Sequence, residues 1–464
     1  MARTPTKDVI VLLPGILGSV LSRDGDDVWA PSPGAIGRAL WSLGRSVREL
    51  RLTDDPWEKD DLGDGVAATR LMPDVHIVPG LWGIDGYTAI TKMIVDHFDV
   101  VAGETYIELP YDWRRDNRVA ARALRRLADD KLHAARQRDP DAKLVLVGHS
   151  MGGLVARYFL ECLDGWRDTR MLITFGTPYR GSLNAVDFLA NGFVKKLGPL
   201  KVADLSDLLR SMTSVYQLLP VYPCIDLGDG YVRPAETGGR IPGLDEDRAV
   251  GALADFHRAI EAGTEQHEPN AYAIHSVVGI TQGTKQSARL DGDRLVVEEL
   301  HGGEDMGGDG TVPRVSSTPV ETDSWQPQYQ PMYSADRHAS LQNADPVQTQ
   351  LLGILTARPL GAFRSVQGVR LEAPELLAVD EPLAVRALPD LAALTLAASV
   401  TDLATGRVAV PPVEMWRDAD EVHTIELPPL PPGDYRLAVH AGGTSAGLVD
   451  PVHGLVCVVD DMES

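Results

Sequence analysis

Cysteine is scarce in this sequence, which has three in 464 residues. The number of cysteines is odd, and their spacing is not typical of metal ligands, which argues against both a disulfide framework and a zinc site. The three are Cys162, Cys224 and Cys457. Long apolar runs are also missing, because no stretch reaches the about 18 apolar residues that a membrane span needs. We therefore expect a protein of the reducing cytoplasm.

Positive charge is the second deficit. The chain has 44 Lys and Arg residues against 66 Asp and Glu residues, a formal net charge of −22 at pH 7. Such a charge repels phosphate backbones and anionic lipid surfaces, so we expect no nucleic acid among the partners. Any lipid contact has to come from apolar side chains. Trp41, Leu43 and Trp57 are the candidates, and the alternative is that these side chains are buried.

The N-terminus shares one feature with a signal peptide, since Arg3 and Lys7 precede the apolar run VIVLLPGILGSVL. Two features argue against a signal peptide. The pair Pro14-Gly15 interrupts the run early, and the SRDGDD that follows offers no small-residue cleavage site. We therefore expect a strand at the start of this run.

Short apolar, β-branched segments recur between helical ones along the first three quarters of the chain. The expected strands are DVIVLL, TYIEL, KLVLVG, MLITFG and AIHSVVG. Residues 117–139 carry apolar side chains at helical spacing and are expected to form a crossover helix before KLVLVG. This alternation is typical of an α/β fold with a buried parallel sheet.

The C-terminal part of the chain has a different pattern. From Leu371 to Asp460 apolar residues recur with a period near two between turn signals such as ATG and LPPLPPGD, which predicts an all-β, sandwich-like domain. The chain is also longer than a single core usually supports. We expect two domains, over residues 1–362 and 371–460, and the sequence identifies no protein partner for the second one.

Residues 184–220 contain two amphipathic runs. The second is LSDLLRSMTSVYQLLP, and the first places five apolar residues on one helical face: Val186, Leu189, Phe193, Val194 and Leu197. Two interpretations are open. These are helices packed on the sheet, or they form a cap over an active site, which would also need an apolar underside.

The pentapeptide GHSMG, residues 148–152, points to a nucleophile. A serine hydroxyl is a poor nucleophile at neutral pH unless it is exposed, held near a base and close to donors for an oxyanion. The expected strand KLVLV precedes this pentapeptide and the expected helix GLVARYFLECL follows it, which is the context of a nucleophile elbow. We predict that Ser150 is the nucleophile, and the alternative is a buried serine turn.

An elbow of this kind predicts a carboxylate and then a histidine later in the chain. Asp309 lies in the glycine-rich loop GGDGTVP, and His338 lies just before a helical stretch, so we predict these two as the acid and the base. Asp305 and Asp336 are alternatives for the acid. His149 is not chosen as the base, because it lies within the elbow and cannot easily turn onto Ser150.

A metal loop over HGGEDMGGD, residues 301–309, is a further alternative, but its oxygen ligands lack a recognised spacing. We therefore predict no metal and no organic cofactor.

The oxyanion donors are expected to be two backbone N–H groups. One is that of Met151, after the nucleophile, and the other is that of Ile16, where Pro14-Gly15 turns the chain after the first strand.

Six motifs occur in a specific order: PGILGS, YDWR, GHSMGG, FGTPYRGS, GDGTVP and a following histidine. With these motifs the chain resembles the lecithin:cholesterol acyltransferase family, which also contains phospholipid:diacylglycerol acyltransferases and lysosomal phospholipase A2-type enzymes. The resemblance covers roughly residues 8–356. It implies an α/β-hydrolase fold with cap or lid insertions, catalytic roles for Ser150, Asp309 and His338, and oxyanion contacts from Ile16 and Met151.

Members of that family act on acyl esters of lipids. The resemblance therefore implies a serine esterase, lipase or O-acyltransferase with an acyl-ester or lipid substrate, and a lid over residues 29–61 that contacts lipid surfaces transiently. Secretory members carry a signal and disulfides, and we expect neither here. The alternative function is a catalytically silent hydrolase fold that binds a ligand or partner, with the C-terminal domain as its interaction module.

Overall fold

The computed structural model describes residues 3–30, 50–73, 76–78, 82–197, 200–268, 271–292, 294–321, 331–356, 368–445, 449 and 451–459. A six-stranded parallel sheet lies at the centre of these residues, in the order β19-β16-β11-β10-β2-β9. Its strands are β2 (Val9–Leu13), β9 (Tyr106–Glu108), β10 (Leu144–His149), β11 (Thr169–Phe175), β16 (Ala273–Gly279) and β19 (Met332–Ser334).

The expected strands of this sheet are confirmed, and their burial explains the sequence pattern. Every residue of β2 and of β10 is buried, because helices cover both faces of a parallel sheet. The strands therefore appear in the sequence as continuous apolar runs rather than as alternating ones.

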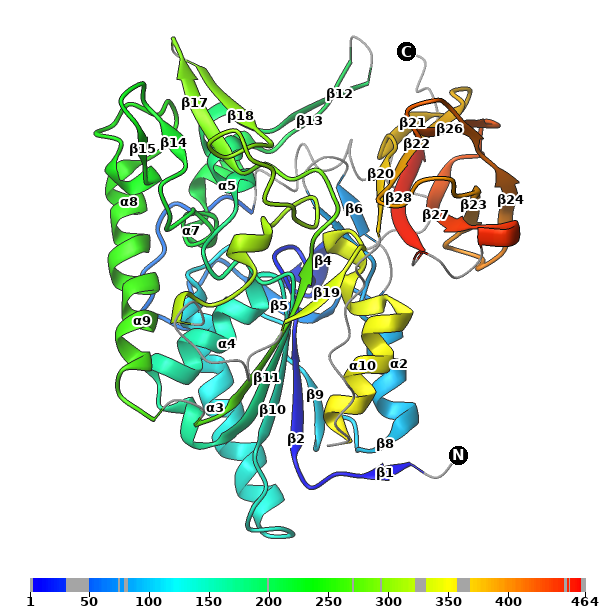
Figure 1. Ribbon diagram of the computed structural model, residues 1–464. Helices are drawn as coiled ribbons and strands as arrows, with labels where there is room; N and C mark the ends of the chain where they lie inside the picture. The colour runs from blue at the N-terminus through cyan, green and yellow to red at the C-terminus, as the bar shows by residue number, and fades with distance from the viewer. Residues whose placement is uncertain are drawn as a thin grey trace.

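Helices cover the two faces of the sheet, with α3, α4 and α9 on one side and α2 and α10 on the other (Figure 1). The predicted helix over 117–139 is α3, which ends at Arg136 and begins after Asp116, whose side chain accepts a hydrogen bond from the Arg118 N–H. The architecture is that of an α/β-hydrolase. The helices are α2 (Thr88–His97), α3 (Asn117–Arg136), α4 (Met151–Cys162), α9 (Arg258–Thr264) and α10 (Asp345–Leu355).

Smaller sheets are inserted between these elements. They are built from β1 (Thr4–Pro5), β3 (Ser19–Arg23), β4 (Asp26–Trp29), β5 (Val66–Leu71), β6 (His76–Val78), β7 (Trp82–Ile84), β8 (Phe98–Asp99), β14 (Ile225–Asp226), β15 (Tyr231–Val232), β17 (Ser287–Asp291) and β18 (Arg294–Glu298). Much of the predicted lid over residues 29–61, including Trp41 and Leu43, lies outside the described residues. Trp57 is described, and it is half-buried beneath Arg118, whose guanidinium carbon lies 4.3 Å from the centre of the indole ring.

The prediction that Val194 and Leu197 continue a helical face is wrong. Helix α5 ends at Asn191, and Gly192 follows with a φ of 74°, a conformation that ends helices. The chain then forms an antiparallel hairpin, which projects at the top of Figure 1. The elements of this segment are α5 (Leu183–Asn191), β12 (Val194–Leu197), β13 (Leu200–Asp204), α6 (Ser206–Ser211) and α7 (Thr213–Tyr216), and α8 (Glu246–Gly251) lies further along the chain.

The C-terminal β region, residues 369–459, contains two sheets, as the period-two pattern predicts. Their orders are β20-β22-β26-β25 and β21-β28-β27-β23-β24. The region has an apolar cluster of its own and lies at the upper right of Figure 1. The strands are β20 (Val369–Glu372), β21 (Leu376–Ala378), β22 (Leu383–Pro389), β23 (Leu396–Asp402), β24 (Val408–Glu414), β25 (Trp416–Arg417), β26 (His423–Leu427), β27 (Gly433–Ala441) and β28 (Val452–Val459).

The predicted domain boundary between residues 362 and 371 falls largely on residues 357–367, which lie outside the described ranges, so it stays a prediction. Within the described ranges, every helix is too short or too polar to cross a bilayer.

Candidate active site

Ser150 lies at the sharp turn between β10 and α4, with a φ of 51° and a ψ of −124°. A positive φ is costly for a residue other than glycine, and such strain persists where surrounding contacts impose it. The FGTP motif supplies two of those contacts. The Ser150 N–H donates to the carbonyl oxygen of Phe175 at 2.8 Å, and Thr177 Oγ1 donates to the Ser150 carbonyl oxygen at 2.9 Å.

The structure brings the three predicted residues Ser150, His338 and Asp309 together. His338 Nε2 lies 2.9 Å from Ser150 Oγ, and His338 Nδ1 lies 2.7 Å from Asp309 Oδ2. All three side chains are buried, with Ser150 5% exposed. Asp309 can hold a proton on Nδ1, which leaves Nε2 free to accept the proton of the serine hydroxyl.

Backbone groups fix the position of Asp309. Its other carboxylate oxygen, Oδ1, accepts hydrogen bonds from the N–H groups of Thr311 at 2.9 Å and Val312 at 2.7 Å. The N–H of His338 donates to the Asp309 carbonyl oxygen at 2.9 Å. The acid and the base are therefore joined twice, through side chains and through the backbone.

The two alternative carboxylates are engaged elsewhere. Asp305 Oδ1 accepts from the side-chain amide of Gln286 at 2.6 Å, and Asp336 Oδ2 accepts from the Ser334 hydroxyl at 2.9 Å. Of the three candidate carboxylates, Asp309 is the one that contacts the His338 ring.

The predicted oxyanion donors belong to two backbone turns beside Ser150. The Gly18 N–H donates to the Gly15 carbonyl oxygen at 3.0 Å, which closes a four-residue turn with Ile16 at its second position. Met151 is the first residue of α4. Neither the Ile16 N–H nor the Met151 N–H has a hydrogen-bond acceptor in the part of the chain that the structure describes. Both groups are available to a ligand, as the N–H groups of a helix start commonly are.

His149 is fully buried beside the elbow and does not act on Ser150. Its Nδ1 lies 2.9 Å from Tyr87 Oη, and its Nε2 lies 3.1 Å from the carbonyl oxygen of His338. Desolvation, with a smaller contribution from repulsion by His338, lowers the pKa of His149 to about 3. His149 is therefore neutral at ordinary pH. The contact between His149 and Tyr87 could not be predicted from the sequence, because Tyr87 lies 62 residues before His149 in the chain.

Contacts from the C-terminal β region reach the residues on both sides of His338. Arg337 Nη2 donates to the Leu371 carbonyl oxygen at 2.5 Å, and His453 Nδ1 lies 3.2 Å from Asp336 Oδ1. Asp85, whose N–H donates to the Ala339 carbonyl oxygen, also pairs with Arg436 of β27. The sequence contained no signal for these contacts, which join segments far apart in the chain.

A cavity of about 400 Å³ lies along this contact. It is lined by the loops of Asp309 and His338 on one side and by β20 and the start of β28 on the other. The C-terminal β region thus borders the acid and base loops directly.

The histidine of the loop proposed as a metal-site alternative contacts other groups. His301 Nε2 lies 2.9 Å from the Pro223 carbonyl oxygen, and its ring stacks on Tyr231 with centroids 4.4 Å apart. Over the described ranges, no three or more His, Cys, Asp or Glu side chains are grouped as metal ligands.

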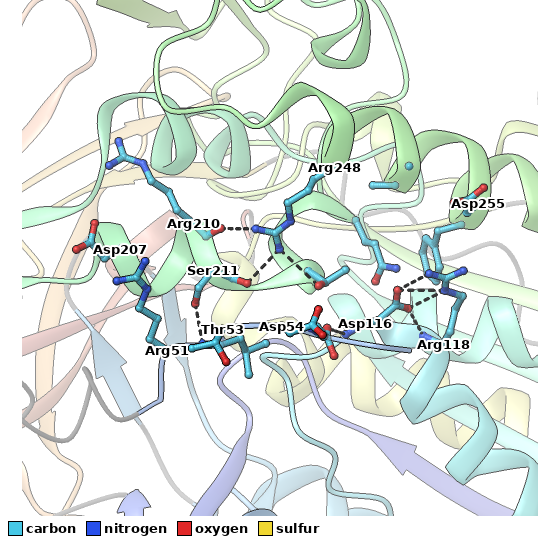
Figure 2. A pocket seen from close by; sticks show the side chains of 17 residues that line it. Arg51, Thr53, Asp54, Asp116, Arg118, Asp207, Arg210, Ser211, Arg248 and Asp255 are labelled. Carbon is cyan, nitrogen blue, oxygen red and sulfur yellow. Dashed lines mark hydrogen bonds and ion pairs between the residues drawn. The ribbon is translucent and has the colours of Figure 1, made fainter. Parts of the chain in front are cut away.

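Figure 2 shows a larger hollow, of about 550 Å³, between residues 51–55, the start of α3 and helices α6 to α8. Its lining includes none of the three site residues. Two of the arginines that face it bind other residues of its lining. Arg118 binds the carboxylate of Asp116, and Arg248 donates to the carbonyl oxygens of Arg210 and Ser211. We assign this hollow no part in the site.

Comparison with known proteins gives a consistent result. The family model of lecithin:cholesterol acyltransferase matches residues 83–233. Human lysosomal phospholipase A and acyltransferase is 32% identical over 127 residues, which make up 25% of this chain and 29% of that protein. Lipase A of Sodiomyces alcalophilus is 39% identical over 82 residues, 17% of this chain and 19% of that one. The chain spans less than a third of the length of these two relatives.

Among solved structures, the lipase BlEst2 of Bacillus licheniformis in its propeptide form aligns over 98% of this chain and 94% of its own, at 14% identity and a TM-score of 0.35. The family match contains the serine elbow together with the YDWR and FGTP motifs. Residues 83–233 are therefore similar to the lecithin:cholesterol acyltransferase family, at modest identity to its relatives.

Proposed function

We propose that this protein is a serine-dependent lipid acyl-ester hydrolase or O-acyltransferase that works through an acyl-enzyme. The observation that carries the proposal is the hydrogen-bonded series from Ser150 Oγ to His338 Nε2, at 2.9 Å, and from His338 Nδ1 to Asp309, at 2.7 Å. The names of the relatives, a phospholipase and acyltransferase and a lipase, support lipid esters as the substrate class.

In this mechanism Ser150 Oγ attacks the acyl carbonyl carbon while His338 Nε2 takes the serine proton. Asp309 holds the Nδ1 proton and stabilises the imidazolium. The N–H groups of Ile16 and Met151 donate to the oxyanion of the tetrahedral intermediate. His338 then returns the proton to the leaving alcohol, and the acyl group stays on Ser150.

The second half of the reaction repeats these steps with a new nucleophile. Water or an alcohol attacks the acyl-enzyme, His338 takes its proton, and Ser150 is released with the proton restored. We propose that hydrolysis predominates in dilute buffer, because no side chain of the described site marks an alcohol pocket. Transfer then requires an alcohol at high concentration, which competes with water for the acyl-enzyme.

The test combines labelling and turnover. A serine-directed fluorophosphonate should label the parent protein at Ser150 and leave Ser150→Ala unlabelled, with the labelled peptide identified by mass spectrometry. Short nitrophenyl esters, long ones and phospholipid vesicles, each with a labelled acyl group, then define the donor. Absence of labelling and of turnover on all three would favour the catalytically silent alternative instead.

We also propose a cytoplasmic location, which the three cysteines support, since Cys162, Cys224 and Cys457 are all free. The mammalian relatives are named as lysosomal proteins, so the location needs a direct measurement. Fractionation of the source cells, with activity assayed in each fraction, provides it. Recovery of the activity outside the cytoplasmic fraction would contradict the proposal.

A further inference from the structure

The peptide unit between Pro14 and Gly15 is held at both of its polar groups by tyrosine hydroxyls. Its N–H, on Gly15, donates to Tyr87 Oη at 2.8 Å. Its carbonyl oxygen, on Pro14, accepts from Tyr111 Oη at 2.7 Å. The tyrosines are 1% and 5% exposed, so water does not compete freely for these bonds. Two bonds in opposite directions fix the plane of this peptide.

The next peptide unit along the chain carries the Ile16 N–H. It belongs to the turn that the Gly18 N–H closes onto the Gly15 carbonyl oxygen, and Leu17 has a φ of 63° in that turn. A side chain on Gly15 would place its Cβ 2.9 Å from the Ser150 Cβ, so this backbone lies directly against the nucleophile. Any rotation of the Pro14–Gly15 peptide would therefore redirect the Ile16 N–H relative to Ser150.

A further hydrogen bond extends this arrangement to the base. Since His149 is neutral and a carbonyl oxygen can only accept, its proton lies on Nε2 and is donated to the His338 carbonyl oxygen, 3.1 Å away. Nδ1 is then an acceptor, and Tyr87 donates its hydroxyl proton to it at 2.9 Å. The Tyr87 oxygen in turn accepts from the Gly15 N–H. Each hydrogen bond in this series therefore has one assigned donor: the Gly15 N–H, the Tyr87 hydroxyl and the His149 Nε2–H.

We infer that Tyr87 and Tyr111 are positioning residues that hold the Pro14–Gly15 peptide so that the Ile16 N–H points at the developing oxyanion, and that Tyr87, through His149, ties this turn to the backbone of His338. The inference rests on the proposed function, because it assigns the two tyrosines to the transition state of that reaction. We call the two tyrosines and the peptide between them the tyrosine clamp.

The test removes each hydroxyl and keeps each ring, in Tyr87→Phe, Tyr111→Phe and the double variant. With a short nitrophenyl ester, kcat should fall about 10- to 100-fold with KM nearly unchanged, somewhat less than the loss of a whole oxyanion donor. Affinity for a trifluoromethyl ketone, which forms an oxyanion adduct with the serine, should fall by the same factor as kcat/KM. A purely structural role would lower the melting temperature without this parallel.

Tyr435→Phe is the matched control. Tyr435 is 2% exposed in the C-terminal β region, and its hydroxyl donates to the Pro431 carbonyl oxygen at 2.8 Å, so the same chemical change occurs at a hydroxyl that bonds its own β region rather than the Pro14–Gly15 peptide. It should leave kcat and ketone affinity unchanged. The two clamp variants are independent, so if one fails to fold the other still decides.

The inference is overturned if each clamp variant that folds keeps kcat within about twofold of the parent, or if kcat falls while ketone affinity stays the same. A rise in KM alone would overturn it too. Failure of the proposed function gives a different result, in which the parent protein neither hydrolyses the ester nor binds the ketone, or Ser150→Ala does both.

Discussion

The Arg337 side chain donates from Nη2 to the carbonyl oxygen of Leu371 at 2.5 Å, so the residue immediately before His338 is bonded to the first strand of the C-terminal β region. Arg337 Nη1 also lies 3.8 Å from the Glu375 carboxylate. We therefore expect the position of the His338 ring to depend on a part of the chain that contributes none of the three site residues.

Arg337→Gln should therefore impair catalysis without unfolding the protein. Loss of the contact frees the loop of His338, and displacement of a reacting group by about 1 Å can cost up to about 100-fold in rate. Arg386→Gln is the control, because Arg386 pairs with Glu372 at the surface within the C-terminal β region. Steady-state kinetics on a nitrophenyl ester measure the effect, and equal kcat in both variants would show that Arg337 does not position His338.

Removal of all residues from 369 onward should give a less stable and less active protein. Truncation removes the Val369 carbonyl oxygen and the Leu371 N–H, both of which bond the buried Gln282 side chain, and leaves that amide without these partners. Solubility, melting temperature and ester turnover of the truncated chain check this. Parent-like turnover would show that the first 368 residues position the triad unaided.

Ser150→Ala should abolish turnover, and His338→Ala should cost about as much, of order a millionfold in the best-studied case, because the triad acts as a unit. The double variant should be little worse than either single one. Rates on the best ester substrate, with circular dichroism to verify folding, provide the measurement. Parent-level turnover in either single variant would refute the assignment.

Asp309→Asn should lower kcat by about 10⁴-fold, because an amide no longer selects the histidine tautomer that leaves Nε2 as the acceptor. Asp305→Asn is the matched control, since that side chain bonds Gln286 and the Gly307 N–H rather than His338. Its kcat should stay close to the parent value. If Asp305→Asn is the inactive variant, the acid has been assigned to the wrong carboxylate.

Acid should destabilise the protein through its buried histidines. Burial lowers the pKa of His257 to about 4 and contributes most to lowering that of His149 to about 3, both from 6.5. Below pH 6.5 the unfolded chain therefore binds protons that the folded chain does not. The free energy of unfolding should fall by about 2 kcal/mol per histidine between pH 7 and pH 5.

Denaturant unfolding at the two pH values measures this loss. His257→Gln should reduce it, because glutamine does not titrate, whereas His133→Gln, on the exposed face of α3, should not change it. An unchanged loss in His257→Gln would rule out His257 as a source of the acid sensitivity.

The sequence by itself determined the elements that local pattern controls. The strands β2 and β10 are buried at every residue and are mainly apolar, so they could be predicted from their local sequence pattern. The glycine-flanked turn at Ser150 could be predicted between a strand and a helix. The order of serine, aspartate and histidine along the chain pointed to His338 as the base and to Asp309 as the acid, with Asp305 and Asp336 left as alternatives for the acid. Where the local signal was ambiguous the prediction failed, as at Val194, where Gly192 ends the helix.

Only the tertiary structure decided which groups meet across long separations. Asp305, Asp309 and Asp336 carry the same side chain, so the sequence could not decide which of them is the acid. In the structure, the loop of Asp309 directs its carboxylate at the His338 ring. Tyr87, Tyr111 and Arg337 could not be predicted, because their partners lie 72, 97 and 34 residues away and hydrogen bonding between distant segments leaves no periodic pattern in sequence. Because these groups are buried, they cannot bond water instead, and each polar group needs a hydrogen-bond partner within the fold.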